Sequence, residues 1–230
     1  MVTENTLCVG ILCVVIPLAF LALRVVFVLP ALRVNQDTRQ SDSTKGFVLI
    51  RPGAQLMILL GSGGHTGEML RLLNKSNIGA CSRTWLASSG DTASLLKARD
   101  FEESTMTNLS SQIHYAELYR ARKVGELVVL SILSTTKSIY STAQKLRELP
   151  IPDVLLVNGP GTSVPVAYLL FMLKLIGVCK TRVVYIESLA RVHNLSLSGR
   201  LILPIADRFI VQWIPLATKY RRAEYYGILV

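Results

Sequence analysis

Beyond residue 50, the apolar positions of the chain fall into short runs, separated by longer stretches in which they recur every three or four residues. Short continuous apolar runs are typical of buried strands, and the longer periodic stretches are typical of helices. The predicted strands are 55–60, 84–87, 112–115, 153–157, 182–186 and 208–211, and the clearest helices are 122–147 and 164–176. This alternation predicts an α/β fold, a single Rossmann-like domain with one parallel sheet.

The N-terminal segment has a different pattern, because no charged residue occurs between Leu7 and Leu23 and the apolar run resumes after Arg24. A helix of about 20 residues crosses the roughly 30 Å hydrocarbon core of a bilayer. We therefore predict one transmembrane helix within residues 1–34, with Arg24 reaching the membrane interface. A cleaved signal peptide fits less well, since residues 1–6 contain no basic residue.

The basic residues around this segment predict its orientation. Lysine and arginine are absent before it, whereas Arg33, Arg39 and Lys45 follow it. The positive-inside rule then places the N-terminus in the lumen and the rest of the chain in the cytosol. Residues 35–50 are predicted to form a polar tether, and residues 51–230 the folded domain.

The composition narrows the range of partners. The 230 residues carry 25 Lys and Arg against 15 Asp and Glu, a net charge of +10. This excess indicates nucleic acid, acidic lipid or a phosphorylated substrate. Nucleic acid is disfavoured because no binding motif for it occurs. The four cysteines lack the spacing of a zinc site, so we expect neither a metal nor a cofactor.

The segment Gly61–Glu68 (GSGGHTGE) follows the first predicted strand and opens a helix. Its glycines allow a ligand to approach the backbone, and the start of a helix attracts anions. It lacks the Gly-Lys-Ser/Thr of a Walker loop, and Thr66 stands where a dinucleotide fingerprint has its third glycine. His65 is a candidate general base or phosphate donor. The alternative is a plain strand-to-helix turn.

Further polar residues follow the other predicted strands. Asn158–Thr162 (NGPGT) comes after strand 153–157, Glu187 after strand 182–186 and Asp91 after strand 84–87. Open α/β sheets bind ligands at the carboxyl ends of their strands, so we expect these groups to line one site. The alternatives are a plain turn for the first, a cap or ion pair for Glu187 and a helix cap for Asp91.

Seven motifs occur in order over nearly the whole chain: LLGSGGHTGEML, ASSGD, RARKVGE, LLVNGPGT, YIESLARV, VQW and YYG. Together they resemble the membrane-anchoring subunits of the UDP-N-acetylglucosamine transferases of asparagine-linked glycosylation. The resemblance implies the N-terminal half of a split GT-B glycosyltransferase. The other half is a separate soluble chain that binds UDP-N-acetylglucosamine, and we expect the present chain to be inactive without it.

The resemblance also implies the reaction and the site. N-acetylglucosamine passes from UDP to N-acetylglucosaminyl-diphospho-dolichol on the cytosolic face of the endoplasmic reticulum membrane, a location that extends to the nuclear envelope. His65 or Glu187 would activate the acceptor 4-hydroxyl. The residues expected to bind the diphosphate and sugar of the acceptor are Gly61, Ser62, Gly63, Gly64, Thr66, Glu68, Asp91, Asn158, Gly159, Pro160, Gly161 and Thr162.

Aromatic residues near the C-terminus are expected to bind the soluble subunit. This predicted interface comprises Trp213, Tyr220, Tyr225, Tyr226 and Gly227. The alternative is a C-terminal element that packs on its own domain.

Two other functions remain open at this point. The chain could be a membrane scaffold that recruits the catalytic subunit and contributes no catalytic group, although the intact GSGGHT motif argues against this. It could also be a membrane-bound enzyme with a nicotinamide cofactor. The missing third glycine disfavours that function, as does the lack of an acidic residue closing strand 84–87.

Overall fold

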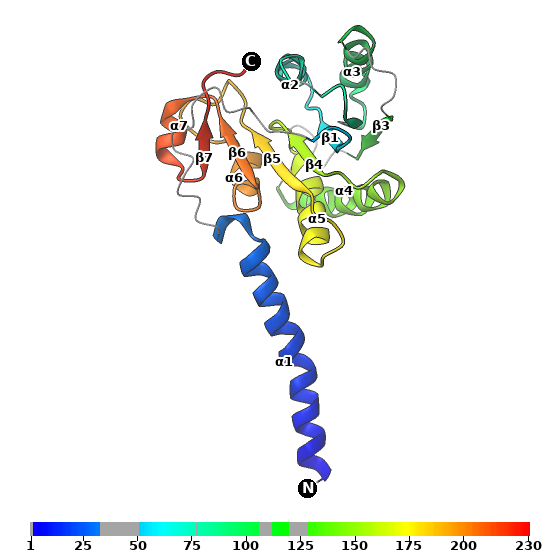
Figure 1. The fold of residues 1–230 in the computed structure, drawn as a ribbon, viewed down its shortest axis with the longest axis vertical. Coiled ribbons are helices and arrows are strands. Elements are labelled where there is room, and N and C mark those ends of the chain that lie inside the picture. Colours follow the sequence, from blue (N-terminus) through cyan, green and yellow to red (C-terminus); the bar gives the residue numbers. More distant parts are fainter. Residues whose placement is uncertain (1, 33–50, 77, 106–111, 120–127) are drawn as a thin grey trace.

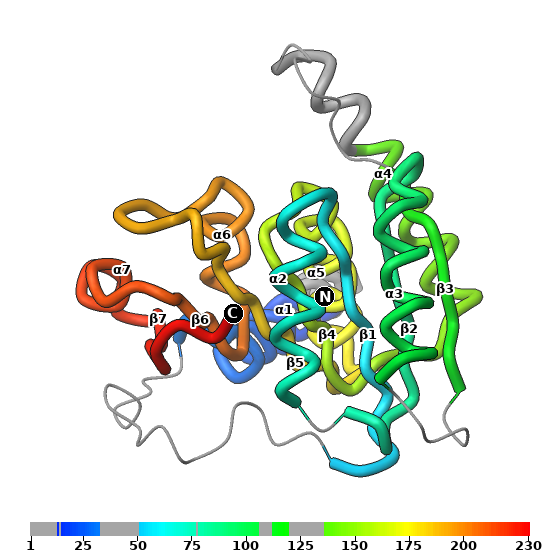
Figure 2. The backbone as a smooth tube through the Cα atoms, turned by 90° about the horizontal axis from the view of Figure 1, so that it is seen from above, coloured from blue at the N-terminus to red at the C-terminus, as the bar shows by residue number. Residues whose placement is uncertain are grey.

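The structure is a computed structural model that describes residues 2–32, 51–76, 78–105, 112–119 and 128–230. Seven strands form one sheet, in the order β3-β2-β1-β4-β5-β6-β7, and all neighbours pair in parallel. The strands are β1 (Gln55–Leu59), β2 (Ser82–Ser88), β3 (Ile113–Leu118), β4 (Val154–Val157), β5 (Arg182–Ile186), β6 (Arg208–Val211) and β7 (Ala223–Tyr225). Figure 2 shows the two ends of this order, with β3 on one side and β7 on the other. The predicted α/β fold with a parallel sheet is confirmed.

Helices follow most of the strands and cover both faces of the sheet. They are α2 (Gly64–Asn74), α3 (Thr92–Thr105), α4 (Val128–Glu148), α5 (Ser163–Leu175), α6 (Leu197–Ile202) and α7 (Ile214–Lys219). Successive residues of β1 point to opposite faces, so Leu56 and Ile58 join one core and Met57 and Leu59 join the other. The first core includes residues of α2 and α3, and the second includes residues of α5 and α6. Burial on both faces explains why β1 is apolar after Gln55.

The order of strands in the sheet switches from one side of β1 to the other between β3 and β4. Strands β2 and β3 lie on one side of β1, and β4 to β7 extend on the other. In doubly wound sheets, ligands bind at the carboxyl ends of the strands beside such a switch point. The loops that follow β1 and β4 occupy this position.

The edge strand β7 was not predicted, since Arg208–Val211 was expected to be the last strand. β7 pairs with β6 in the register Phe209↔Ala223 and Val211↔Tyr225. It is three residues long and contains Glu224, which forms an ion pair with Arg208. A strand this short with a charged centre lacks the apolar run that makes buried strands recognisable.

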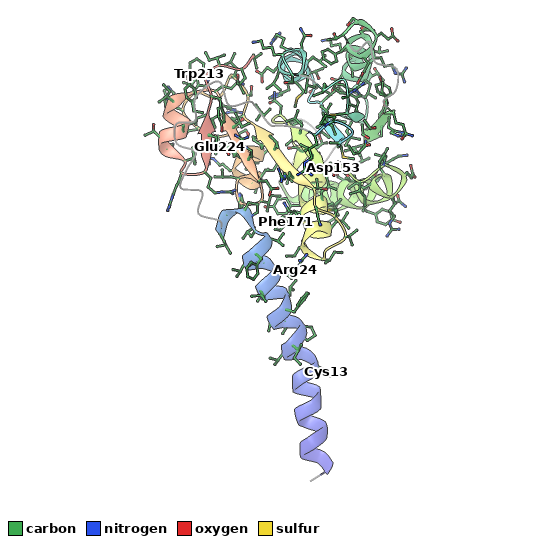
Figure 3. All side chains as sticks on the ribbon, in the orientation of Figure 1. Cys13, Arg24, Asp153, Phe171, Trp213 and Glu224 are labelled. Atoms are coloured by element: carbon green, nitrogen blue, oxygen red, sulfur yellow. The ribbon has the colours of Figure 1, made fainter. Side chains whose placement is uncertain are left out.

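The N-terminal helix α1 (Val2–Val28) extends away from the domain as a rod and is followed by η1 (Pro30–Leu32) (Figure 1). Its last turn packs against α5, where Val28 joins the core with Phe171 and Leu175. Arg24 donates hydrogen bonds to the carbonyl oxygens of Leu175 and Lys174 at the end of α5 (Figure 3). Its position at the membrane interface stays a prediction.

Within the residues that the structure describes, no helix is both long enough and apolar enough to cross a membrane. The transmembrane helix predicted within residues 1–34 is therefore not confirmed. The predicted tether, residues 35–50, lies outside the described residues.

Candidate functional site

The two glycine-rich loops lie side by side at the carboxyl edge of the sheet. Leu59 at the end of β1 pairs with Val157 at the end of β4, so the loops that follow start from neighbouring positions. The first loop leads into α2 and the second into α5. Both loops expected to form the site are thus brought together, with the ends of β2 and β5 on either side.

Two glycines allow these loops to touch through His65. A Cβ atom on Gly159 would lie 2.7 Å from the His65 Cε1, and one on Gly61 would lie 2.8 Å from the His65 Cβ. Gly159 also has a φ of +69°, which side chains other than glycine rarely adopt. Glycine at these two positions therefore lets the imidazole ring lie against the second loop.

Hydrogen bonds connect α2 with the ends of β4 and β5. The Nδ1 of His65 lies 3.2 Å from the Oδ1 of Asn158, a residue that is 2% exposed. The Nδ2 of Asn158 donates to one oxygen of Glu68 at 3.0 Å, and the Oγ of Ser188 donates to the other at 3.0 Å. Four polar side chains from three segments of the chain thus form one continuous network.

A second set of polar contacts supports the loop that follows β1 from its buried side. The Oγ1 of Thr66 donates to the carbonyl oxygen of Gly61 and lies 2.7 Å from the Oγ of Ser94. Ser94 in turn donates its hydroxyl to Asp91, which also accepts from the Ser94 backbone amide. Asp91 therefore caps α3, the alternative considered for it, and Thr66 is 1% exposed. Both residues hold the loop from the inside.

The remaining loop residues face open space. A Cβ on Gly63, Gly64 or Gly161 would meet no atom within 4 Å, and Ser62 is exposed. Gly63 at the start of α2 has no side chain that could cap the helix. The side chain of Thr162 at the start of α5 makes no capping bond. The start of α2 thus lies at an open surface, beside the exposed Gly161 of the second loop, an arrangement suited to phosphate groups.

Thr162 connects the second loop with β2. Its Oγ1 lies 3.0 Å from the Oγ of Ser88, and both side chains are buried. Thr162 therefore fixes the loop, while Pro160 and Gly161 form its outer part.

Glu187 occupies a different environment from the one expected of a base. It is 0% exposed, and its Oε2 accepts hydrogen bonds from the amide and hydroxyl of Ser196 at 3.0 and 3.1 Å. Its Oε1 accepts from the Ser188 amide at 3.1 Å. Burial raises the pKa of the Glu187 carboxyl above its ordinary value. These contacts hold both ends of the loop between β5 and α6, residues 188–196.

The aromatic residues near the C-terminus cluster around β6 and β7, whereas the glycine-rich loops follow β1 and β4. Figure 3 shows Trp213 and Glu224 on this side of the molecule. Trp213 donates its indole N–H to the Leu189 carbonyl oxygen at 2.7 Å, and the Tyr226 hydroxyl donates to Glu224 at 2.8 Å. Tyr220 and Tyr225 pack against the core. Each of these four side chains is half-buried against its own domain. This agrees with the alternative of a C-terminal element that packs on its own domain. A role in partner binding stays a prediction.

Sequence reasoning missed Ser188, Ser94 and Ser196. Ser188 directly follows Glu187 at the end of a predicted strand, which was the only available signal. Its contact with Glu68, 120 positions away, depends on the order of strands in the sheet.

Comparison with known proteins shows which family the sequence matches. Residues 56–229 match the family described as "Oligosaccharide biosynthesis protein Alg14 like". A relative from Debaryomyces hansenii, named UDP-N-acetylglucosamine transferase subunit ALG14, is 51% identical over 231 residues that cover 99% of each chain. Proteins of the same name from Candida albicans and mouse are 49% and 35% identical, over 99% and 78% of this chain and 99% and 85% of their own.

Solved structures with a similar arrangement are more distant. Acinetobacter baumannii MurG has a TM-score of 0.45 and 18% identity, over 70% of this chain and 41% of its own. Arabidopsis thaliana UGT89C1, complexed with UDP, has a TM-score of 0.47 and 12% identity, over 77% of this chain and 50% of its own. The chain spans half or less of the length of these two proteins.

Proposed function

The chain belongs to the Alg14-like family of oligosaccharide biosynthesis proteins, and from this premise we propose that it is the acceptor-binding subunit of a two-chain N-acetylglucosaminyltransferase. Its relatives carry the name of a UDP-N-acetylglucosamine transferase subunit. The proposed acceptor is N-acetylglucosaminyl-diphospho-dolichol, as the family resemblance implies. The observation that carries this proposal is the position of His65, held between two glycine-rich loops where two helices begin.

In this proposal, His65 is the general base. When the acceptor 4-hydroxyl oxygen attacks the anomeric carbon of the donor sugar, its proton passes to the imidazole. The bond between that carbon and the UDP oxygen breaks, and UDP leaves with the electron pair. A positioned base of this kind contributes about 10²–10⁴-fold to the rate. His65 is half-buried, whereas the Glu187 carboxylate is fully buried and bonded to its own loop, so the geometry favours His65.

The diphosphate of the acceptor is proposed to bind along the open side of both loops. The amides at the start of α2 supply N–H donors, and the starts of α2 and α5 supply the positive ends of two helix dipoles. Gly63, Gly64 and Gly161 leave room for phosphate oxygens beside the backbone. Asn158, Pro160 and Gly159 form the wall on the β4 side. Thr66, Asp91 and Thr162 support this surface from within.

We propose that the protein lies at the endoplasmic reticulum membrane, with a lumenal N-terminus and a cytosolic domain. The crossing segment would be residues 1–34 as a whole, of which the structure describes the side chains only in part. The support is the apolar surface of α1, where Ile16, Phe20, Leu23 and Phe27 are all exposed. Such a surface on a projecting helix is costly in water and favourable in lipid. Protease protection tests this topology: an epitope tag before Met1 should resist protease in sealed microsomes, and a tag after Val230 should be cleaved.

The site and α1 lie at opposite ends of α5. This helix begins at the second glycine-rich loop and ends where Arg24 of α1 binds its last carbonyl groups. Its 13 residues correspond to about 20 Å. Because a lipid-linked diphosphate is attached to the bilayer, we propose that the domain lies with its α5 side toward the membrane.

An apolar strip on α5 and α6 supports this orientation. Tyr168, Met172 and Ile176 recur at helical spacing along α5, Leu197 and Leu201 do so on α6, and all five are exposed. The Tyr168 hydroxyl donates to the Leu201 carbonyl oxygen, which shows that the two helices lie side by side. Contact of this strip with lipid would lower the carboxyl edge of the sheet to the headgroups.

The donor sugar nucleotide is proposed to bind to the separate soluble subunit. A GT-B enzyme places its active site between two Rossmann-like domains, and the described residues of this chain form a single sheet. The half-buried aromatic residues around β6 and β7 are the proposed contact with that subunit.

Reconstitution tests the proposed function. Labelled N-acetylglucosamine transfer from UDP to a diphospho-dolichol acceptor should require both chains in one vesicle. Activity of this chain alone would contradict the two-chain assignment. A pure scaffold predicts that substitution of His65 leaves the activity of the pair intact, whereas the present proposal predicts its loss.

A further inference from the structure

We propose that Glu68 is a positioning residue that acts through Asn158 to hold His65 in a single tautomer, with the proton on Nδ1 and a free lone pair on Nε2. This inference rests on the proposed function, since it specifies which nitrogen of His65 accepts the acceptor proton. It follows from the direction of four hydrogen bonds.

The first step is the orientation of the Asn158 amide. An ionised carboxylate can only accept hydrogen bonds, so the group of Asn158 that lies 3.0 Å from Glu68 must be its NH₂. The amide oxygen then necessarily faces the opposite way, toward the Nδ1 of His65. The side chain of Asn158 is 2% exposed, which leaves little room for another orientation.

The second step is the orientation at the other oxygen of Glu68. The Ser188 Oγ accepts a hydrogen bond of 3.3 Å from the Ala190 amide, which does not use the proton of the hydroxyl. Its own proton is available for Glu68, at 3.0 Å. Both oxygens of Glu68 are thus engaged by donors, and the carboxylate has a fixed place between the ends of β4 and β5.

The third step is the tautomer of the imidazole. An amide oxygen is an acceptor, so the Nδ1 that faces it must carry a proton. In neutral His65, the Nε2 is then the nitrogen without a proton and can act as the base. Without this constraint, both tautomers would be populated and a fraction of the molecules would present a protonated Nε2 to the acceptor hydroxyl.

The neutral amide between Glu68 and His65 has a further consequence. A carboxylate in direct contact with an imidazole stabilises the imidazolium form. Asn158 orients the imidazole ring through a neutral amide. His65 is therefore oriented without a negative charge in direct contact with it.

Three variants of the full chain, assembled with its soluble subunit, test the inference. Glu68→Gln places a side chain that can both donate and accept beside Asn158 and so permits the amide to reverse. Glu68→Gln/Asn158→Asp again fixes the direction of the hydrogen bonds. The introduced glutamine would donate to the introduced aspartate, which can only accept and so would accept from His65 Nδ1. Glu148→Gln, on the exposed end of α4, is the matched control for the loss of one carboxylate.

The readout is the ¹⁵N–¹H NMR spectrum of the imidazole rings, which distinguishes the two tautomers without turnover. This chain contains three histidines, and His114 and His193 serve as internal references. We expect wild type and the double variant to show His65 with a protonated Nδ1, and Glu68→Gln to show a mixture. The kcat of Glu68→Gln should fall in proportion to the fraction of His65 that the spectrum shows in the other tautomer, with an unchanged KM for the acceptor, and the double variant should recover part of this loss.

A protonated Nε2 in wild type, or an unchanged His65 spectrum in Glu68→Gln, would overturn the inference. If Glu68→Gln does not fold, the wild-type spectrum and the double variant still decide the question. Failure of the proposed function looks different: the complex would lack transferase activity, or His65→Ala would retain it, whatever tautomer the spectrum shows.

Discussion

The guanidinium Nε of Arg24 donates a hydrogen bond of 3.0 Å to the carbonyl oxygen of Leu175, 151 positions further along the chain. A second nitrogen of Arg24 donates to Lys174 at 3.1 Å. The last carbonyl groups of a helix lack partners within the helix, and its C-terminus attracts cations. Arg24 therefore joins α1 to the domain through the end of α5, with Val28 packed beside Phe171.

Replacement of Arg24 by alanine should weaken this junction. Loss of two hydrogen bonds from a charged donor at a partly buried position should lower the free energy of unfolding by about 1–2 kcal/mol. Thermal unfolding of the full chain in detergent measures the effect, with the exposed Arg51→Ala as the control. Equal unfolding midpoints for the two variants would show that Arg24 contributes nothing to the junction.

Replacement of Gly159 by alanine should damage both the fold and the site. The left-handed backbone costs an alanine about 1–2 kcal/mol, and its Cβ would displace the His65 ring. We expect a lower free energy of unfolding in denaturant titrations together with a loss of transferase activity. Gly161→Ala, in the same loop but with open space around its Cβ, should change stability by less than about 0.5 kcal/mol. Similar stability losses in both variants would contradict this explanation.

The buried ion pair between Arg83 and Glu102 should be essential for stability. Arg83 is fully buried and binds both oxygens of Glu102, at 2.6 and 2.8 Å, and Trp85 donates its indole N–H to the same carboxylate. Glu102→Ala leaves the guanidinium without its counter-charge, which costs about 3–5 kcal/mol.

The matched control is Glu148→Ala, because the exposed pair of Glu148 with Lys145 is worth only about 0–1 kcal/mol. Equilibrium denaturation of both variants gives the comparison. A small loss for Glu102→Ala would mean that water or another group compensates Arg83.

Glu187 should make stability depend on pH. Burial raises its pKa in the folded state above the ordinary value of 4.5, so between these two pKa values the folded chain binds more protons than the unfolded chain. The free energy of unfolding should therefore fall as the pH rises through this interval and then level off. In Glu187→Gln this component should be absent. Parallel pH profiles for wild type and variant would show that Glu187 does not titrate in this way.

The buried centre of the sheet could be predicted from sequence because its strands are covered on both faces and appear as uninterrupted apolar runs. The ends of strands were harder to place: β2 begins before Thr84, since Arg83 within it is charged but buried through Glu102. The edge strand β7 has no apolar run, because packing at an edge requires less burial.

The candidate site was predictable as two loops but not as a network. Glycine, histidine and asparagine after strands indicated where a ligand would bind. The link from Glu68 through Asn158 to His65, and from Glu68 to Ser188, arises only when β1, β4 and β5 are adjacent. Glu187 supports residues 188–196 because its side chain is fully buried and the chain returns to it at Ser196.

The most direct test of the central claim is the rate of N-acetylglucosamine transfer by the reconstituted pair with His65→Ala in this chain. The account predicts a fall of about 10²–10⁴-fold, the contribution of a positioned base, while the two chains still co-purify. His114→Ala, on the edge strand β3, should retain wild-type activity. A His65→Ala complex that transfers the sugar at the wild-type rate would contradict the assignment of catalysis to this loop.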